Sequence, residues 1–256
     1  MINKIKQMVE KGEKVLGSFS QLGGSMAAEC LGIAGLDFFV VDTEHGPCDV
    51  ESVIPAILAA DRRGITPFVR IKDPTRPSVL KMLDIGAKGL IVPCIQTKEE
   101  VERLVEYAKY FPMGRRGFAF TLAGAFGYAD FARDTQNYFD ISNNQTLLIP
   151  QCETRGCLDQ IEEIASMEGV DGILIGPYDL SVALGKPAQM DNPELLDAIN
   201  RILEACKANG KISMIFTGST DAVKTFFDQG FDCVACGLDA IFLIEAYKSL
   251  IAQAKG

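Results

Sequence analysis

Residues 37–72, DFFVVDTEHGPCDVESVIPAILAADRRGITPFVRIK, hold the pattern that decides the fold. Two short apolar runs, 37–45 and 66–72, flank a segment over 49–64 in which apolar residues recur every three to four positions. The short runs are apolar at consecutive positions, which is typical of strands covered on both faces, whereas the middle segment has helical periodicity. A strand, a helix and another strand in this order predict parallel strands joined by a crossover helix. The buried stripe expected on this helix consists of Val50, Val53, Ile54, Ile57 and Leu58.

The same unit recurs along the whole chain of 256 residues. Most of the apolar runs are separated by helical patterns, two of which cover 77–86 and 192–210 and end at a glycine, as helices commonly do. Eight strands that alternate with helices favour a single closed (β/α)8 barrel, the TIM-barrel fold, over an open sheet. The eight expected strands lie at 15–21, 37–45, 66–72, 89–95, 146–153, 172–177, 212–218 and 232–239.

Two segments are not explained by this repeat. The interval 114–146 is rich in Gly, Ala and Phe and contains a ninth candidate strand at 117–121. Because loops this long often serve as lids or binding loops, we expect it to cover the barrel mouth. The terminal segment 240–254 is apolar almost all round, which predicts a helix buried against another subunit. No linker-like tract divides the chain, so residues 1–256 are expected to form one domain.

Composition narrows the class of protein. The 25 basic and 34 acidic side chains give a net charge of −9, and no basic block is longer than Arg115-Arg116, which argues against nucleic-acid binding. No apolar stretch approaches the roughly 20 residues that cross a bilayer, and the first 14 residues lack the apolar core of a signal peptide. We therefore expect a cytoplasmic protein with no membrane segment.

The eight cysteines follow no disulfide framework. Cys94, Cys152, Cys233 and Cys236 lie within apolar runs, where a thiol packs as a small hydrophobic group. The CVAC stretch at 233–236 has no second C-x-x-C pair and only one histidine to accompany it, which argues against a structural zinc site. Reduced core cysteines are the expectation for a cytosolic chain.

Polar side chains follow several of the apolar runs. His45 ends the second strand and Arg70 the third, Gln151 and Glu153 end the fifth, and GPYDLS (176–181) follows the sixth. In barrels of this kind the chemistry gathers at the carboxyl ends of the strands. Gln151 and Glu153 are two residues apart, so both can face the mouth.

Glu153 and Asp179 come from neighbouring strands and could share one hard divalent ion. A buried carboxylate is unfavourable unless it is paired or bound to a cation. A purely structural alternative has Glu153 paired with Arg155 and Asp179 capping a turn. The residues alone leave both interpretations open.

His45 is the only histidine, so it is either a structural group at a strand end or the proton-handling group of an enzyme. With one histidine and no G-x-S-x-G motif, a serine hydrolase is improbable. No P-loop and no G-x-G-x-x-G motif follows a strand, which argues against nucleotide use. A Schiff-base mechanism would need a lysine in the mouth, for which Lys72 is the one candidate.

Several motifs together resemble the HpcH/HpaI aldolase family, whose members include 4-hydroxy-2-oxoheptanedioate and 2-dehydro-3-deoxyglucarate aldolases. They are GLDFFVVDTEHGPCD, PFVRI, LKMLDIGAKGLIVPCIQTKEE, PQCETRGCL, GVDGILIGPYDLS and VACGLD, and the resemblance spans roughly residues 15–250. It implies a (β/α)8 barrel whose C-terminal helix is exchanged between subunits of a hexamer, a trimer of dimers. It also implies reversible, metal-dependent aldol cleavage of a 2-keto-4-hydroxy acid to pyruvate and an aldehyde.

The resemblance assigns the metal and the charges around it. Glu153 and Asp179 would hold a divalent ion such as Mg²⁺, Mn²⁺ or Co²⁺, which would chelate the carboxylate and keto oxygens of pyruvate and stabilise its enolate. Arg70 would place positive charge at the same enolate oxygen. Gln151, the backbone at Tyr178 and Asp179 would contact the substrate.

The resemblance also assigns the base. His45 would accept the proton of the C4 hydroxyl, through a water molecule, and Asp84 would raise its basicity. Asp42 would lie close by. Glu44 receives no role.

The chain departs from the family pattern at two places. Tyr178 stands where familiar members have a small residue, which narrows the pocket, and the stretch GFAFTLAGAFGYADF (117–131) lacks an arginine that some members carry there. These two departures argue against an acidic aldehyde as the substrate. Two alternatives remain: a CoA-ester lyase of the citrate lyase β or malyl-CoA type, and a non-catalytic barrel that binds a keto acid.

Overall fold

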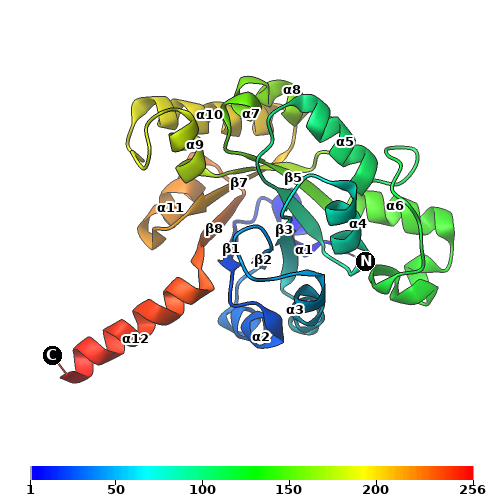
Figure 1. Ribbon diagram of the computed structural model, residues 1–256, viewed down its shortest axis with the longest axis horizontal. Coiled ribbons are helices and arrows are strands. Elements are labelled where there is room, and N and C mark those ends of the chain that lie inside the picture. The colour runs from blue at the N-terminus through cyan, green and yellow to red at the C-terminus, as the bar shows by residue number, and fades with distance from the viewer. Residues whose placement is uncertain (1, 256) are drawn as a thin grey trace.

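Eight parallel strands form the closed barrel that the sequence predicts. The computed structural model describes residues 2–255. The strands pair in chain order, and β8 closes the barrel against β1, with the helices arranged around it (Figure 1). The strands are β1 (Val15–Ser20), β2 (Phe38–Asp42), β3 (Thr66–Arg70), β4 (Gly89–Val92), β5 (Leu147–Cys152), β6 (Gly172–Ile175), β7 (Ile212–Thr217) and β8 (Cys233–Leu238). The prediction of a single TIM barrel is confirmed, and every strand lies within its expected range.

Each strand supplies two separate cores, which explains why the runs are apolar at consecutive positions. Phe38 and Val40 belong to the cluster inside the barrel, whereas Phe39 and Val41 belong to the cluster under the helices. Successive side chains of a strand point to opposite faces. The helix α1 (Lys4–Glu10) adds Ile5 to the inner cluster and closes the end of the barrel where the strands begin. The other end, where the strands finish, is left as the mouth.

The helices begin and end where the sequence signals predict. In α3 (Val50–Arg63), Asp49 and Ser52 form a capping box, and Gly64 ends the helix with a φ of +68°. Leu58 is 53% exposed, so its expected place on the buried stripe was wrong. The buried side of the helix is formed instead by Val53, Ile57 and small alanines. The other helices around the barrel are α2 (Gly24–Ala34), α4 (Arg76–Asp84), α5 (Lys98–Ala108), α7 (Arg155–Asp159), α8 (Ile161–Ser166), α9 (Pro177–Ala183), α10 (Pro193–Ala208) and α11 (Thr220–Gln229).

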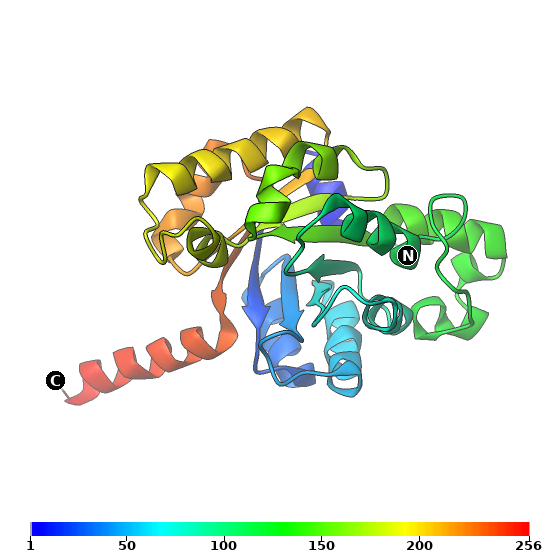
Figure 2. The same ribbon diagram turned by 45° about the horizontal axis from the view of Figure 1, so that its top comes forward.

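The segment 114–146 extends to the side of the barrel near α4 and α5, seen in green in Figure 2. It contains two short 3-10 turns, η1 (Leu122–Gly127) and η2 (Asp130–Ala132), and the helix α6 (Thr135–Gln145). The candidate strand at 117–121 forms no ladder. Aromatic rings hold the segment: Phe118 packs on Tyr110 and Tyr138 at centroid distances of 6.3 and 5.8 Å.

The last helix, α12 (Asp239–Lys255), projects away from the barrel in both views (Figures 1 and 2). Its large apolar side chains are exposed, from 45% at Phe242 to 60% at Tyr247. Asp239 anchors its first turn by accepting hydrogen bonds from Ser20 Oγ (2.6 Å) and the backbone N–H of Gln21 (2.9 Å). None of the helices within residues 2–255, α12 included, is long and apolar enough to span a membrane.

Candidate active site

A cavity of about 210 Å³ lies at the mouth of the barrel. Its polar lining brings together His45, Arg70, Gln151 and Asp179, four of the residues expected at the strand ends. The remaining lining is mainly apolar and consists of Phe19, Gln21, Leu174, Gly176, Tyr178, Phe216 and Leu238. Strand order explains this convergence, because parallel strands of a closed barrel all end at one rim.

Arg70 and Asp42 form the buried charged pair of the mouth. They face each other at the ends of β3 and β2, and Arg70 donates from Nε (2.9 Å) and Nη2 (2.7 Å) to the two carboxylate oxygens. Burial alone would raise the pKa of Asp42, but the hydrogen bonds and charge of Arg70 outweigh it and hold the pKa below its usual value. The guanidinium also lies 4.8 Å from the centre of the Phe19 ring. Arg70 is thus fixed in place as a permanent cation.

Asp42 also shapes the turn that carries His45. Its Oδ1 accepts hydrogen bonds from the backbone N–H groups of Glu44 (3.2 Å) and His45 (3.3 Å). A Cβ at Gly46 would lie 2.3 Å from the carbonyl oxygen of Asp42, so the turn requires glycine there. The result is a histidine at the rim whose side chain is 64% exposed.

Glu44 is a site residue that the sequence reasoning missed. Its Oε2 lies 3.3 Å from Arg70 Nε and 3.9 Å from His45 Nε2, so it bridges the two groups. Burial raises the pKa of Glu44, although the charge of Arg70 acts in the opposite direction. No sequence signal identifies it, because the strand ends at Asp42 and Glu44 lies in the turn that follows.

Glu153 is held by neutral donors. Its Oε1 accepts a hydrogen bond from the backbone N–H of Cys94 at 2.7 Å, and its Oε2 accepts one from Gln151 Nε2. Cys94 has a φ of 59°, in the left-handed region that is uncommon outside glycine. It is also exposed in the loop after β4, so its expected place in the apolar core was wrong, while Cys152 is buried as expected.

The structural alternative for Glu153 does not form. Arg155 pairs with Glu194 instead, at 3.5 Å. Burial raises the pKa of the Glu153 carboxyl, and the charge of Asp179, in the first turn of α9, raises it further. The two carboxylates therefore lie near each other, and neither forms an ion pair among the described residues.

This donor set fits a divalent metal. Carboxylate oxygens are the ligands that Mg²⁺ and Mn²⁺ prefer, and such ions commonly use one or two carboxylates together with water and substrate oxygens. The Oε1 atom of Gln151 has no hydrogen-bond partner, although the side chain is buried. No cluster of three or more metal-binding side chains occurs within residues 2–255, so Glu153 and Asp179 would leave the remaining positions to water and substrate.

Asp84, the segment 114–146 and Lys72 were expected at the mouth, but they lie elsewhere in the chain. Asp84 is the last residue of α4, far from the strand ends along the helix, and pairs with Arg116 at 2.7 Å. In the described part of the chain, the carboxylate within 4.0 Å of the His45 imidazole is that of Glu44, at 3.9 Å. The segment 114–146, which contains Arg116, contributes no lining residue to the mouth cavity. Lys72 lines a different cavity, between α3 and α4.

The barrel and its mouth define a class of protein. Polar groups gathered at the carboxyl ends of the strands are typical of barrel enzymes, and the cavity of about 210 Å³ that they line suits a small substrate.

The chain belongs to the HpcH/HpaI aldolase/citrate lyase family, whose model matches residues 16–246. It is 35% identical to a pyruvate aldolase of Rhizobium etli over 98% of this chain and 97% of that protein. It is 32% identical to a hydroxypyruvate/pyruvate aldolase of Roseobacter denitrificans over 99% of this chain and 98% of that protein. A family member from Burkholderia cenocepacia J2315 superimposes with a TM-score of 0.91, at 30% identity, over 99% of this chain and all (100%) of that one. The chain is thus an aldolase, a carbon–carbon lyase.

Proposed function

We propose that this aldolase is a divalent-metal-dependent (class II) pyruvate aldolase. It would cleave a 2-keto-4-hydroxy acid reversibly to pyruvate and an aldehyde. The observation that carries the proposal is the pair of carboxylates Glu153 and Asp179, neither of which forms an ion pair among the described residues, near the fixed guanidinium of Arg70. The names of the relatives from Rhizobium etli and Roseobacter denitrificans support pyruvate as the keto acid.

Glu153 and Asp179 would hold the metal, and Mg²⁺, Mn²⁺ or Co²⁺ each suits two carboxylates. When bound, it would supply a Lewis acid for the carboxylate and keto oxygens of the keto acid. Gln151 and the backbone at Tyr178 would orient that substrate. Gln151 Oε1 is buried and has no hydrogen-bond partner in the protein, so a bound substrate or water molecule would complete its hydrogen bonding.

Arg70 would stabilise the negative charge that develops on the keto oxygen as the C3–C4 bond breaks. The hydrogen bonds and ion pairs of its guanidinium use Nε and Nη2, which leaves Nη1 for a substrate oxygen. The pairing with Asp42 fixes the guanidinium in advance, and such preorganised charge contributes most in a site with little water.

His45 would accept the proton of the C4 hydroxyl, directly or through water, during cleavage, and return it during addition. Its exposed position at the rim suits a group that meets the aldehyde half of the substrate, whereas the keto half lies deeper near Arg70. Glu44 would orient the imidazole, because its Oε2 lies 3.9 Å from His45 Nε2.

Competing chemistries find less support in the lining. Lys72 lies outside the mouth cavity, which disfavours a Schiff base. A CoA-ester lyase needs cations for the phosphates of CoA, yet Arg70 is the only lysine or arginine among the residues that line the mouth cavity. A non-catalytic keto-acid-binding barrel would not need His45 at the rim.

The test combines the purified protein with pyruvate and an aldehyde panel in the presence of Mn²⁺, of EDTA or of borohydride. We expect Mn²⁺ to support aldol addition and exchange of the pyruvate methyl protons in D₂O, and EDTA to abolish both. Borohydride is expected to trap no adduct. A borohydride-trapped adduct at Lys72 would show that the enzyme uses a Schiff base and not a metal. If correctly folded, Mn²⁺-loaded protein exchanged no pyruvate methyl protons, the non-catalytic keto-acid-binding barrel would be favoured.

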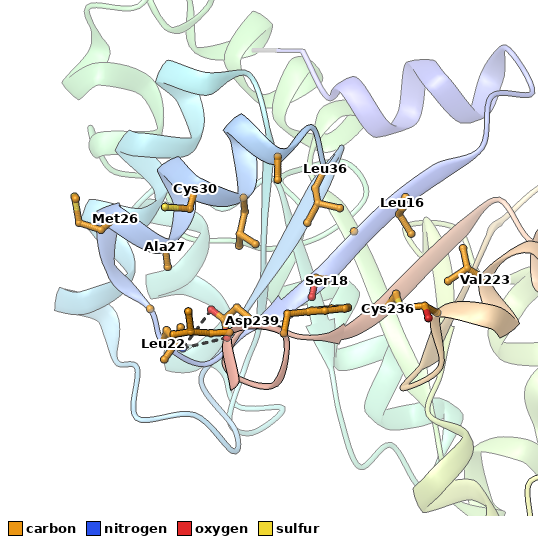
Figure 3. A pocket seen from close by; sticks show the side chains of 17 residues that line it. Leu16, Ser18, Leu22, Met26, Ala27, Cys30, Leu36, Val223, Cys236 and Asp239 are labelled. Atoms are coloured by element: carbon orange, nitrogen blue, oxygen red, sulfur yellow. Dashed lines mark hydrogen bonds between the residues drawn. The ribbon is translucent and has the colours of Figure 1, made fainter. Parts of the chain in front are cut away.

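We further propose that α12 packs on another copy of the chain. Between α2 and α11, beside β1 and β8, lies an apolar groove of about 790 Å³, whose lining includes Leu16, Met26, Leu36 and Val223 (Figure 3). The chain's own α12 contributes only residues of its first turns, Asp239, Phe242 and Leu243. An exposed apolar helix and an open apolar groove in one molecule suit exchange between subunits, and the trimer of dimers remains the proposed assembly.

Assembly would also explain two expectations that a single chain does not meet, namely that Asp84 lies beside His45 and that the segment 114–146 covers the mouth. Asp84 and the segment 114–146 lie on one face, joined by the Asp84–Arg116 ion pair. If that face meets the mouth of a neighbouring subunit, Asp84 reaches His45 and the segment covers the mouth. The test mixes inactive His45→Ala and Asp84→Ala proteins after dissociation. Activity that returns in the mixture supports shared sites, and a mixture as inactive as its parents excludes them.

A further inference from the structure

Tyr178 separates the mouth cavity from a second cavity. The second cavity, of about 700 Å³, lies over the start of α11 and the first turns of α12. Both cavities are lined by Tyr178, Phe216 and Leu238. These three side chains are therefore the wall between the reacting groups and a space more than large enough for a longer substrate.

The Tyr178 side chain has no structural task that explains its size. It is 51% exposed, and its hydroxyl makes no hydrogen bond in the described part of the chain. The hydroxyl faces Gly218, since a Cβ built there would lie 3.9 Å from Tyr178 Oη. The ring thus stands across the opening between the two cavities, with its polar end toward the second one.

The volume on the inner side of the wall is small. At about 210 Å³ the mouth cavity lies below the roughly 300–1,000 Å³ typical of ligand pockets. Pyruvate, with six non-hydrogen atoms, must share this space with the aldehyde. Only an aldehyde of a few carbon atoms can be held without displacing Tyr178.

The charges around the wall oppose an acidic aldehyde. Arg70 is the only lysine or arginine that lines either cavity, and it is already paired with Asp42 and Glu44. The second cavity is lined by Glu245, whose Oε1 is paired with Lys248 Nζ at 2.7 Å, and no lysine or arginine is among its described lining residues. A carboxylate at the far end of an aldehyde would therefore find no unpaired cation among the residues that line either cavity.

We infer that Tyr178 is the specificity-determining residue for the aldehyde, and that it restricts the enzyme to short, uncharged aldehydes. The inference rests on the proposed function. Removing the ring would join the two cavities, so longer aldehydes would gain access to the reacting groups while the pyruvate half of the site keeps its lining.

The size test compares kcat/KM for hexanal and propanal, with pyruvate and Mn²⁺ held constant. We expect the ratio of kcat/KM for hexanal to kcat/KM for propanal to be low in wild type and to rise at least tenfold in Tyr178→Ala. Tyr178→Phe, which keeps the ring, leaves the ratio within twofold of wild type. Ser219 lines only the second cavity, so Tyr178→Ala/Ser219→Trp, which refills that cavity, is expected to reverse most of the gain. An unchanged ratio in Tyr178→Ala overturns the inference.

The charge test compares butanal with succinic semialdehyde, which has the same chain length and a carboxylate. Wild type is expected to prefer butanal at least tenfold in kcat/KM, and a preference for the acid overturns the charge restriction. Pyruvate methyl exchange in D₂O needs no aldehyde and is measured alongside. Loss of exchange in wild type means that the proposed function has failed, whereas normal exchange with unchanged ratios means that only the assignment of Tyr178 has failed.

Discussion

Arg70 donates hydrogen bonds to both carboxylate oxygens of Asp42, from Nε at 2.9 Å and from Nη2 at 2.7 Å, and both side chains are buried. Two parallel charge-assisted bonds fix the plane of the guanidinium as well as its position. The same carboxylate holds the backbone N–H groups of Glu44 and His45. One buried acid therefore organises both the proposed oxyanion-stabilising group and the turn that carries the proposed base.

Replacing Asp42 is expected to destabilise the fold strongly. Asp42→Asn leaves the Arg70 charge buried with a weaker partner, and breaking such a pair costs about 3–5 kcal/mol. Each kcal/mol corresponds to about 2–4 °C in Tm for a chain of this size. Thermal unfolding at pH 7 measures the loss, and exposed Asp228→Asn is the control, with little expected change.

The Asp42 effect should depend on pH in one direction. Because Arg70 lowers the pKa of Asp42, its stabilisation is complete above the ordinary aspartate value of about 3.9 and is lost as the pH falls through the lowered value. The Tm difference between wild type and Asp42→Asn should therefore shrink on acidification below about pH 4. A difference that grows on acidification would contradict this assignment.

His45→Ala is expected to remove catalysis without affecting the fold. The side chain is 64% exposed, so its removal should change Tm little. Loss of a general base typically lowers kcat by about 10²–10⁴-fold. Steady-state kinetics measure kcat, and Mn²⁺ binding followed by electron paramagnetic resonance should be unchanged. A variant that unfolds instead would show that the histidine is structural.

Much of the fold and of the site could be predicted from the sequence, for a simple geometric reason. Strands of a closed barrel are buried on both faces, so they read as continuous apolar runs, and a polar residue at the end of such a run lies at the rim. Arg70 and Gln151 were located in this way, and both line the mouth cavity.

The missed features depend on local geometry or on assembly. Glu44 turns inward because Asp42 binds the backbone of the turn, which no periodicity reveals. Asp84 was assigned by resemblance alone, and within one chain the helix α4 carries it away from the rim. Cys94 leaves the apolar run because its left-handed backbone ends the strand early.

Glu153→Gln is expected to stabilise the metal-free protein while it abolishes activity. Burial raises the pKa of Glu153, so the ionised side chain destabilises the fold: stability is greatest below the ordinary glutamate value of about 4.3 and falls as the pH rises through the raised value. A neutral amide avoids this loss, and Gln151 Oε1, which lacks a partner, can accept its hydrogen bond after an amide flip.

Thermal unfolding in EDTA at pH 7 should therefore give a Tm for Glu153→Gln a few degrees above wild type, since each kcal/mol corresponds to about 2–4 °C. The difference should narrow near pH 4. Added Mn²⁺ should raise the Tm of wild type and leave the variant unchanged, because ligand binding stabilises only a protein that binds it. A lower Tm for the variant in EDTA would show that the carboxylate serves the fold.

Disrupting the groove between α2 and α11 is expected to break the assembly. Met26 lines this groove and is exposed in a single chain, so a charge there costs the monomer little but would be buried under the α12 of another copy. Met26→Glu should shift sedimentation toward the 27.8 kDa monomer, whereas Met26→Leu should keep the larger mass of wild type. Since Asp239 anchors the first turn of α12, the helix cannot easily fold back to fill its own groove. A wild-type protein that sediments as a monomer, or a Met26→Glu protein that keeps the wild-type mass, would rule out this packing.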